Sequence, residues 1–253
     1  MAAAAVIAAL GGMIAGSFVS VVAHRVPRGL SIVGPRSQCP SCEGMIAAYD
    51  NVPVLSWLAL RGHCRHCREP ISARYPLLEL AVGAMFAATA VVLRDDPLQL
   101  ALGLILVGTL AAVTLTDLEL RVIPNRILLA AAIVGLAIIA AADPAILASR
   151  VAWGLVAGGG LLVVALAYPR GMGMGDVKLA AVLGLYLGRA VAPALLVAFA
   201  TGAIVGLALM ARHGASARKR AIPFGPFLAL GGMVGLLAGD VLVDWYLDAF
   251  AGD

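Results

Sequence analysis

Four cysteines are the residues whose type and spacing point most directly to a chemistry. They form two pairs separated by 21 residues, Cys39-Pro-Ser-Cys42 and Cys64-Arg-His-Cys67. Two such pairs can supply four thiolates that converge on Zn²⁺, the closed tetrahedral arrangement of a structural zinc site. The sequence therefore predicts that zinc is bound by Cys39, Cys42, Cys64 and Cys67.

Two alternatives to this zinc site use the same segment. A redox-active Cys-x-x-Cys pair usually accompanies a thioredoxin-like βαβ pattern, which is not seen here. His63 and His66 flank the second pair and could replace a thiolate, but we interpret them as solvated loop residues. Because a loop of roughly 50 residues cannot bury a large core, zinc would supply its folding energy.

Two aspartates beside apolar runs are the next candidates for chemistry. Asp117 follows Leu115-Thr116, and Asp176 ends the glycine-rich stretch that begins at Gly171. Ionisable residues at membrane depth are costly and are functional candidates by default. Two carboxylates brought close can share a proton, so that one activates water and the other acts as the acid. Each aspartate taken alone could equally be an interfacial residue, and a helix N-terminus favours a carboxylate such as Asp176.

Other charged residues are interpreted structurally. Glu79, just after Pro76, is expected in the first turn of a helix, where the dipole stabilises a carboxylate; a role beside the catalytic site is the alternative. Lys178 is expected to reach the membrane surface as a cation rather than to act in catalysis. Three aspartates that recur every four residues near Trp245 are assigned to the outer membrane interface: Asp240, Asp244 and Asp248.

The composition indicates the kind of scaffold that must position these residues. The chain has 253 residues, of which 62% are hydrophobic and 13% charged, whereas a soluble domain has about 45–50% and about 25%. This excludes a soluble enzyme, a disordered tail and a nucleic-acid-binding module. Barrel strands would alternate in polarity, so the long apolar runs predict an all-α membrane bundle of about eight spans: 2–23, 76–93, 98–116, 124–142, 151–168, 177–188, 190–211 and 226–247.

The basic residues predict the orientation of this bundle. No basic residue precedes the first run, whereas Arg25 and Arg28 follow it, so we expect a retained anchor with its N-terminus outside. Assigning four segments to the cytoplasm captures 15 of the 18 basic residues, as the positive-inside rule requires: 24–75, 117–126, 169–178 and 212–222. Both termini are then outside. The expected organisation is a first helix (1–23), a cytoplasmic zinc-binding loop (24–75) and a seven-helix membrane core (76–253).

Several short segments, taken in order, carry a resemblance to a known family. They are Gly16-Ser17-Phe18 with Val21-Val22 and Arg25-Val26-Pro27, Asp50 to Trp57, Ile71 to Pro76, Asp117 with Ile123-Pro124-Asn125, Gly173-Met174-Gly175-Asp176 with Lys178-Leu179, and Ile222 to Pro226. With these, the chain resembles the type IV prepilin leader peptidases, bacterial membrane aspartyl proteases, nearly end to end. The Gly-x-Gly-Asp element is similar to the signature of presenilin-type intramembrane proteases. Ser20 stands where the family commonly has Asn.

The resemblance implies an activity and a location. Asp117 and Asp176 would be the catalytic pair of an endopeptidase in the bacterial inner membrane. It would remove the basic leader from a prepilin or pseudopilin at the cytoplasmic face. Many members then methylate the new N-terminus with S-adenosylmethionine, and the cysteine loop usually accompanies these bifunctional forms. Two rivals stay open: a peptidase without methyl transfer, and a proton-coupled transporter that uses both aspartates as a relay.

The site of the methyl donor is not marked by any nucleotide-binding fingerprint. A polar, adenosine-containing molecule cannot lie in hydrocarbon, and segment 24–75 is the only polar segment long enough to contribute much of a pocket. We therefore expect this loop, shaped by zinc, to serve methyl transfer more than cleavage.

Overall fold

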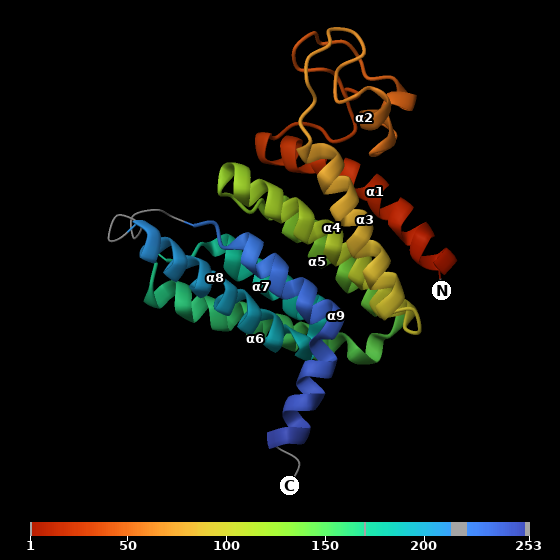
Figure 1. Cartoon of the computed structure of the whole chain (residues 1–253). Coiled ribbons are helices and arrows are strands. Elements are labelled where there is room, and N and C mark those ends of the chain that lie inside the picture. Colours follow the sequence, from red (N-terminus) through yellow and green to blue (C-terminus); the bar gives the residue numbers. More distant parts are fainter. Residues whose placement is uncertain (1, 170, 214–221, 251–253) are drawn as a thin grey trace. The chain divides into compact units, whose positions relative to one another are not determined.

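The computed structural model describes residues 2–169, 171–213 and 222–250, and it divides into two compact units, Met1–Arg94 and Asp95–Asp253 (Figure 1). The described residues form helices and contain no strand, only two isolated β-bridges. The predicted all-α class is therefore confirmed. Four basic residues used in the orientation argument lie outside the described residues: Arg170, Arg218, Lys219 and Arg220.

The first unit is a pair of long helices with the cysteine loop between them. Helix α1 (Ala2–Arg25) packs along α3 (Arg74–Val92). The helices run antiparallel and approach closely at two glycines: a Cβ on Gly12 would lie 2.8 Å from the Cα of Gly83, and one on Gly16 would lie 2.9 Å from that of Glu79. The loop contains three short helices, η1 (Val26–Arg28), η2 (Ala48–Asn51) and α2 (Leu55–Ala59).

The second unit is a bundle of six longer helices (Figure 1). They are α4 (Pro97–Leu120), α5 (Asn125–Ala142), α6 (Leu147–Ala167), α7 (Met174–Leu187), α8 (Val191–His213) and α9 (Gly225–Phe250), with the short turns η3 (Pro144–Ile146) and η4 (Gly188–Ala190). Helix α7 contacts all five of the others. Its side chains are mostly buried, so α7 is the centre of the bundle.

Helix α7 is too short to cross a bilayer by itself. Its 14 residues rise about 21 Å at 1.5 Å per residue, whereas a hydrocarbon core is about 30 Å thick. It continues through η4 into α8, and the two form one 39-residue apolar segment among the seven candidate membrane spans of the described residues. The eight apolar runs of the sequence correspond to α1 and α3 to α9. The chain is thus a multi-pass membrane protein.

Candidate active site and metal centre

The four cysteines converge in the folded loop. Their sulfur atoms all lie within 4.8 Å of one another, and the Sγ atoms of Cys39 and Cys67 are 3.7 Å apart. A tetrahedral site with Zn–S bonds of about 2.3 Å has sulfur atoms about 3.8 Å apart, so the cluster fits zinc. Neither His63 nor His66 belongs to this group among the described residues; His63 Nδ1 instead lies 2.6 Å from the carbonyl oxygen of Arg61.

The two cysteine pairs adopt the same backbone conformation. In each, the first cysteine donates its N–H to the residue two places after the second cysteine: Cys39 to Gly44 at 3.0 Å, and Cys64 to Glu69 at 2.8 Å. The residue that directly follows each pair, Glu43 or Arg68, has a positive φ of 56° or 63°. This repetition is what two equivalent halves of one metal site require.

Backbone N–H groups also favour thiolates, the metal-binding form of cysteine. The N–H groups of Cys42 and Ser41 lower the pKa of the Cys39 thiol to about 7. The N–H groups of Cys67 and His66 likewise lower the pKa of the Cys64 thiol. The first cysteine of each pair is therefore prepared to bind a cation.

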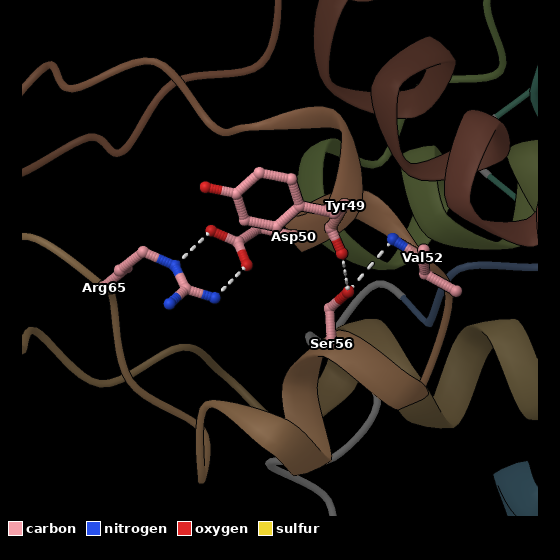
Figure 2. Close-up of polar contacts among 5 residues, drawn as sticks. All are labelled: Tyr49, Asp50, Val52, Ser56 and Arg65. Carbon is pink, nitrogen blue, oxygen red and sulfur yellow. Dashed lines mark hydrogen bonds and ion pairs between the residues drawn. The ribbon is translucent and has the colours of Figure 1, made fainter.

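An ion pair ties the second cysteine pair to the preceding loop (Figure 2). Arg65 donates from Nε and Nη2 to both carboxylate oxygens of Asp50, at 2.7 and 2.6 Å, and its guanidinium lies 5.4 Å from the centre of the Tyr49 ring. Arg65 lowers the pKa of Asp50. The Ser56 hydroxyl accepts from Val52 N–H at 3.0 Å and donates to the Tyr49 carbonyl at 2.9 Å, which fixes the same segment from its other side.

Glu79 supports this loop by a contact that the sequence did not predict. Because α3 begins at Arg74, Glu79 lies beyond the first turn, and the predicted helix-start role is wrong. Its buried carboxylate instead accepts the Val54 N–H at 2.7 Å. Val54 has a φ of 61°, a conformation that β-branched residues rarely adopt. Glu79 thus holds an unfavourable turn of the loop against α3.

Asp117 lies buried in the last turn of α4. The helix ends there because Arg121 takes up the left-handed conformation, a common way to end a helix. Asp117 Oδ2 accepts the backbone N–H of Gly225 at 2.8 Å, across 108 residues of sequence. Gly225 is the first residue of α9, so the positive end of that helix faces the carboxylate.

Asp176 lies buried in the first turn of α7. Its Oδ2 accepts the N–H of Gly173 at 3.0 Å, and its own N–H donates to the Gly173 carbonyl at 3.1 Å. This reciprocal pair closes the start of α7. Such capping leaves the carboxylate in a defined orientation.

Two contacts hold the α4–α5 turn against the start of α7. Ile123 packs on the backbone of Gly175, where a Cβ would lie 2.9 Å from the Ile123 Cβ. Lys178 Nζ donates to Asn125 Oδ1 at 2.9 Å, so Lys178 joins two helices, a role that its expected place at the membrane surface did not include. The end of α4, which carries Asp117, therefore lies beside the start of α7, which carries Asp176.

In each aspartate one carboxylate oxygen accepts a backbone hydrogen bond and the other does not. Oδ2 of Asp117 and of Asp176 accepts a backbone N–H. Among the described residues Oδ1 has no hydrogen-bond partner in either aspartate, and neither Oδ1 atom is fully buried. The arrangement suits two carboxylates that exchange protons with a water molecule or a substrate.

Sequence reasoning did not identify Gly225 as part of this site. The segment Ile222 to Pro226 was recognisable, but a backbone donor leaves no side-chain signal. The one local clue is a proline that directly follows the glycine at the start of an apolar run, which is typical of a helix N-terminus.

Two family models match the chain. The bacterial peptidase A24 N-terminal domain matches residues 10–93, and the type IV leader peptidase family matches residues 104–207. Each matched range falls within one of the two structural units. No solved structure was found to match.

Curated relatives match over nearly the whole chain. A protein of Aeromonas hydrophila is 37% identical and covers 93% of this chain and 91% of its own length. One of Bacillus subtilis (strain 168) is 35% identical, covering 95% and 97%, and one of Burkholderia pseudomallei (strain K96243) is 37% identical, covering 90% and 83%. All three are named prepilin leader peptidase/N-methyltransferase. On this similarity, which spans both units, the chain belongs to the type IV leader peptidase family.

Proposed function

We propose that this protein is a membrane aspartic endopeptidase that removes the basic leader from a type IV prepilin-like or pseudopilin substrate. Family membership supports the substrate class. The observation that carries the mechanism is the pair of buried aspartates at adjoining helix ends, in each of which Oδ2 accepts a backbone N–H and Oδ1 is not fully buried. Membership of a peptidase family disfavours the rival proton-coupled transporter.

The proposed hydrolysis uses the two carboxylates in opposite protonation states. The ionised one takes a proton from water as the oxygen attacks the scissile carbonyl carbon, and the protonated one donates to the carbonyl oxygen. When the C–N bond breaks, a proton passes to the leaving amine. Gly225 and Gly173 keep the two side chains oriented throughout, because backbone donors need not reorganise.

The proposed second activity is N-methylation of the newly exposed N-terminus, with S-adenosylmethionine supplying the methyl group. The names of the relatives support it. Zinc, held by Cys39, Cys42, Cys64 and Cys67, would have a structural role in the first unit, because four thiolates leave no coordination position open for water.

The proposed orientation places the cysteine loop and both catalytic aspartates on the cytoplasmic side of the bacterial inner membrane, with both termini outside. The distribution of basic residues supports it. A cytoplasmic active site would meet the basic leader of a substrate whose apolar segment stays in the bilayer.

The test is co-expression with a type IV prepilin, followed by mass spectrometry of its N-terminus. Wild-type protein should yield a shortened and singly methylated product. Asp117→Asn and Asp176→Asn should each abolish cleavage while the protein still inserts, and the double variant should be no worse, because residues that act as a unit are non-additive. Substantial cleavage by either single variant would remove that aspartate from the mechanism.

A further inference from the structure

A cavity of about 470 Å³ lies in the first unit, between α1 and the cysteine loop. One wall is the last part of α1, and the others are residues 32–37 and 51–53. Sites for small molecules commonly measure about 300–1,000 Å³. The peptidase mechanism proposed above uses none of these residues.

The wall formed by α1 is apolar and belongs to a membrane span. Ile14, Phe18 and Val21 line it, and they lie within Ala2–Arg28, a segment long and apolar enough to cross a bilayer. Ile14 and Phe18 are exposed. In a membrane this wall faces hydrocarbon, so an occupant of the cavity must present an apolar chain to it.

Two arginines give the cavity a positive charge. Arg25 and Arg36 line it, and none of the described residues that line it is acidic. Arg25 donates to the carbonyl oxygens of Ser31 and Pro35, at 2.9 and 2.6 Å, so it holds the loop against the end of α1. Arg36 is exposed and makes no hydrogen bond or ion pair within the described part of the chain. Its guanidinium is therefore available to an anion, and it suits a phosphate through two parallel hydrogen bonds.

The loop beside these arginines carries exposed apolar side chains. Leu30, Ile32 and Val33 are all exposed, and Val33 exposes 92% of its surface. The two hydrogen bonds of Arg25 fix this segment next to the end of the membrane helix. Apolar surface is favoured in lipid and not in water, so the segment is suited to lie in the membrane interface at the level of the arginines.

Polar groups complete the walls of the cavity. Ser17, Ser37 and Asn51 line it and supply hydroxyl and amide groups, which suit the ester and glycerol oxygens of a lipid. The Ser37 carbonyl accepts the Ile46 N–H at 2.9 Å, a bond that spans the first cysteine pair. Arg36 therefore directly precedes a fixed point of the cysteine loop.

We infer that this cavity binds an anionic phospholipid, with the headgroup phosphate on the Arg36 guanidinium and an acyl chain along Ile14 and Phe18. The inference goes beyond the proposed function, because the lipid is neither a substrate nor a reagent of leader cleavage or methyl transfer. The bound lipid would fasten the cysteine loop to the membrane end of α1. In the proposed orientation the cavity lies at the cytoplasmic leaflet, whose surface is negatively charged.

Native mass spectrometry of the purified full-length protein in a neutral detergent tests this site. The protein is titrated with phosphatidylglycerol and with phosphatidylcholine of the same acyl chains. Wild-type protein should bind phosphatidylglycerol more tightly, because the choline cation would meet two arginines and no carboxylate. Arg36→Gln should weaken phosphatidylglycerol binding by about tenfold, the loss expected for a charge-assisted hydrogen bond. Arg36→Lys should restore part of the affinity, because it keeps the charge and loses the paired donors.

The matched control is Arg28→Gln, which removes the same charge from the same unit. Arg28 is exposed, and it does not line the cavity, so its replacement should leave the preference for phosphatidylglycerol intact. Circular dichroism and thermal unfolding without added lipid report whether each variant is folded. Glycerol phosphate, which has the headgroup chemistry but no acyl chain, should compete poorly with the lipid.

Four results would overturn the inference. They are equal wild-type affinity for the two lipids, wild-type phosphatidylglycerol binding by folded Arg36→Gln, an equal loss in Arg28→Gln, and effective competition by glycerol phosphate. The third would assign the effect to the net charge of the surface, and the fourth would identify a soluble phosphate ester as the occupant. Because binding is measured in detergent, these results depend on neither the orientation nor the peptidase activity, which prepilin cleavage tests separately.

Discussion

Replacing Gly225 by alanine tests how Asp117 is held in position. A Cβ at Gly225 would lie 2.7 Å from Asp117 Oδ2 and 3.1 Å from its Cγ. Ordinary contact begins near 3.4 Å, so the carboxylate has to move by about 0.7 Å, and a misplacement of about 1 Å can cost about 10²-fold in rate. We expect Gly225→Ala to lower kcat for leader cleavage by a factor on the order of 10², or about 2.7 kcal/mol of transition-state stabilisation.

The assay is cleavage of a purified prepilin in detergent, with kcat and KM determined separately. KM should change little, because the substitution displaces a reacting group and leaves the substrate-binding surface intact. Two other glycines provide controls. A Cβ on Gly206 meets nothing within 4 Å, and the atoms nearest to one on Gly232, in the same helix as Gly225, belong to the side chains of Leu183 and Leu110, the closest at 2.7 Å. Gly206→Ala should behave as wild type, and Gly232→Ala should perturb packing without moving Asp117.

Two results would contradict this reasoning. One is a folded Gly225→Ala protein whose kcat stays within threefold of wild type. The other is an equal loss of kcat in Gly232→Ala, which would assign the effect to helix packing instead of to the carboxylate. Thermal unfolding of each variant, together with methylation of an already trimmed pilin, separates a displaced Asp117 from a damaged fold.

Four further predictions concern the rest of the molecule. Elemental analysis should find one zinc per chain, with sulfur coordination in X-ray absorption; a metal-free but active native protein would contradict the site. Cys64→Ser should reduce methylation more than cleavage, scored separately by mass spectrometry, and equal losses would mean that the loop supports the peptidase too. Arg65 lowers the pKa of Asp50. Their ion pair should therefore stabilise the loop above about pH 4, which is near the pKa of an aspartate in an unfolded chain. This contribution should disappear as pH falls through the lower pKa that Asp50 has in the folded protein. Protease protection of the loop should therefore decline in acid for wild type, whereas Asp50→Asn should show less protection at neutral pH and a weaker decline. Reporter fusions after residues 45, 95, 170 and 250 should read inside, outside, inside, outside, and an outward reading at 45 would refute the orientation.

The sequence alone determined the features that depend on composition and on the local spacing of residues: the helical class, the cysteine site and the two candidate aspartates. The apolar runs are long because each helix must span the bilayer. The all-α class could therefore be predicted without knowledge of any tertiary contact. The two cysteine pairs could be assigned to one metal site because zinc demands four ligands in a closed set, and the folded loop brings the sulfur atoms within 4.8 Å. Asp117 and Asp176 stood out because charge is rare beside hydrocarbon.

Only the tertiary structure decided which distant groups hold these residues. The Gly225 N–H donates to the Asp117 carboxylate across 108 residues of sequence, and the Glu79 carboxylate accepts the Val54 N–H across 25 residues. Neither contact leaves a periodic pattern, because a backbone N–H is common to almost every residue and side-chain partners are chosen by packing. Hydropathy also gave no sign that α7 is the buried centre of the bundle, because an apolar run looks the same whether lipid or protein surrounds it. The residues that carry out chemistry can be found from their type, whereas the groups that orient them become visible only when the helices are packed.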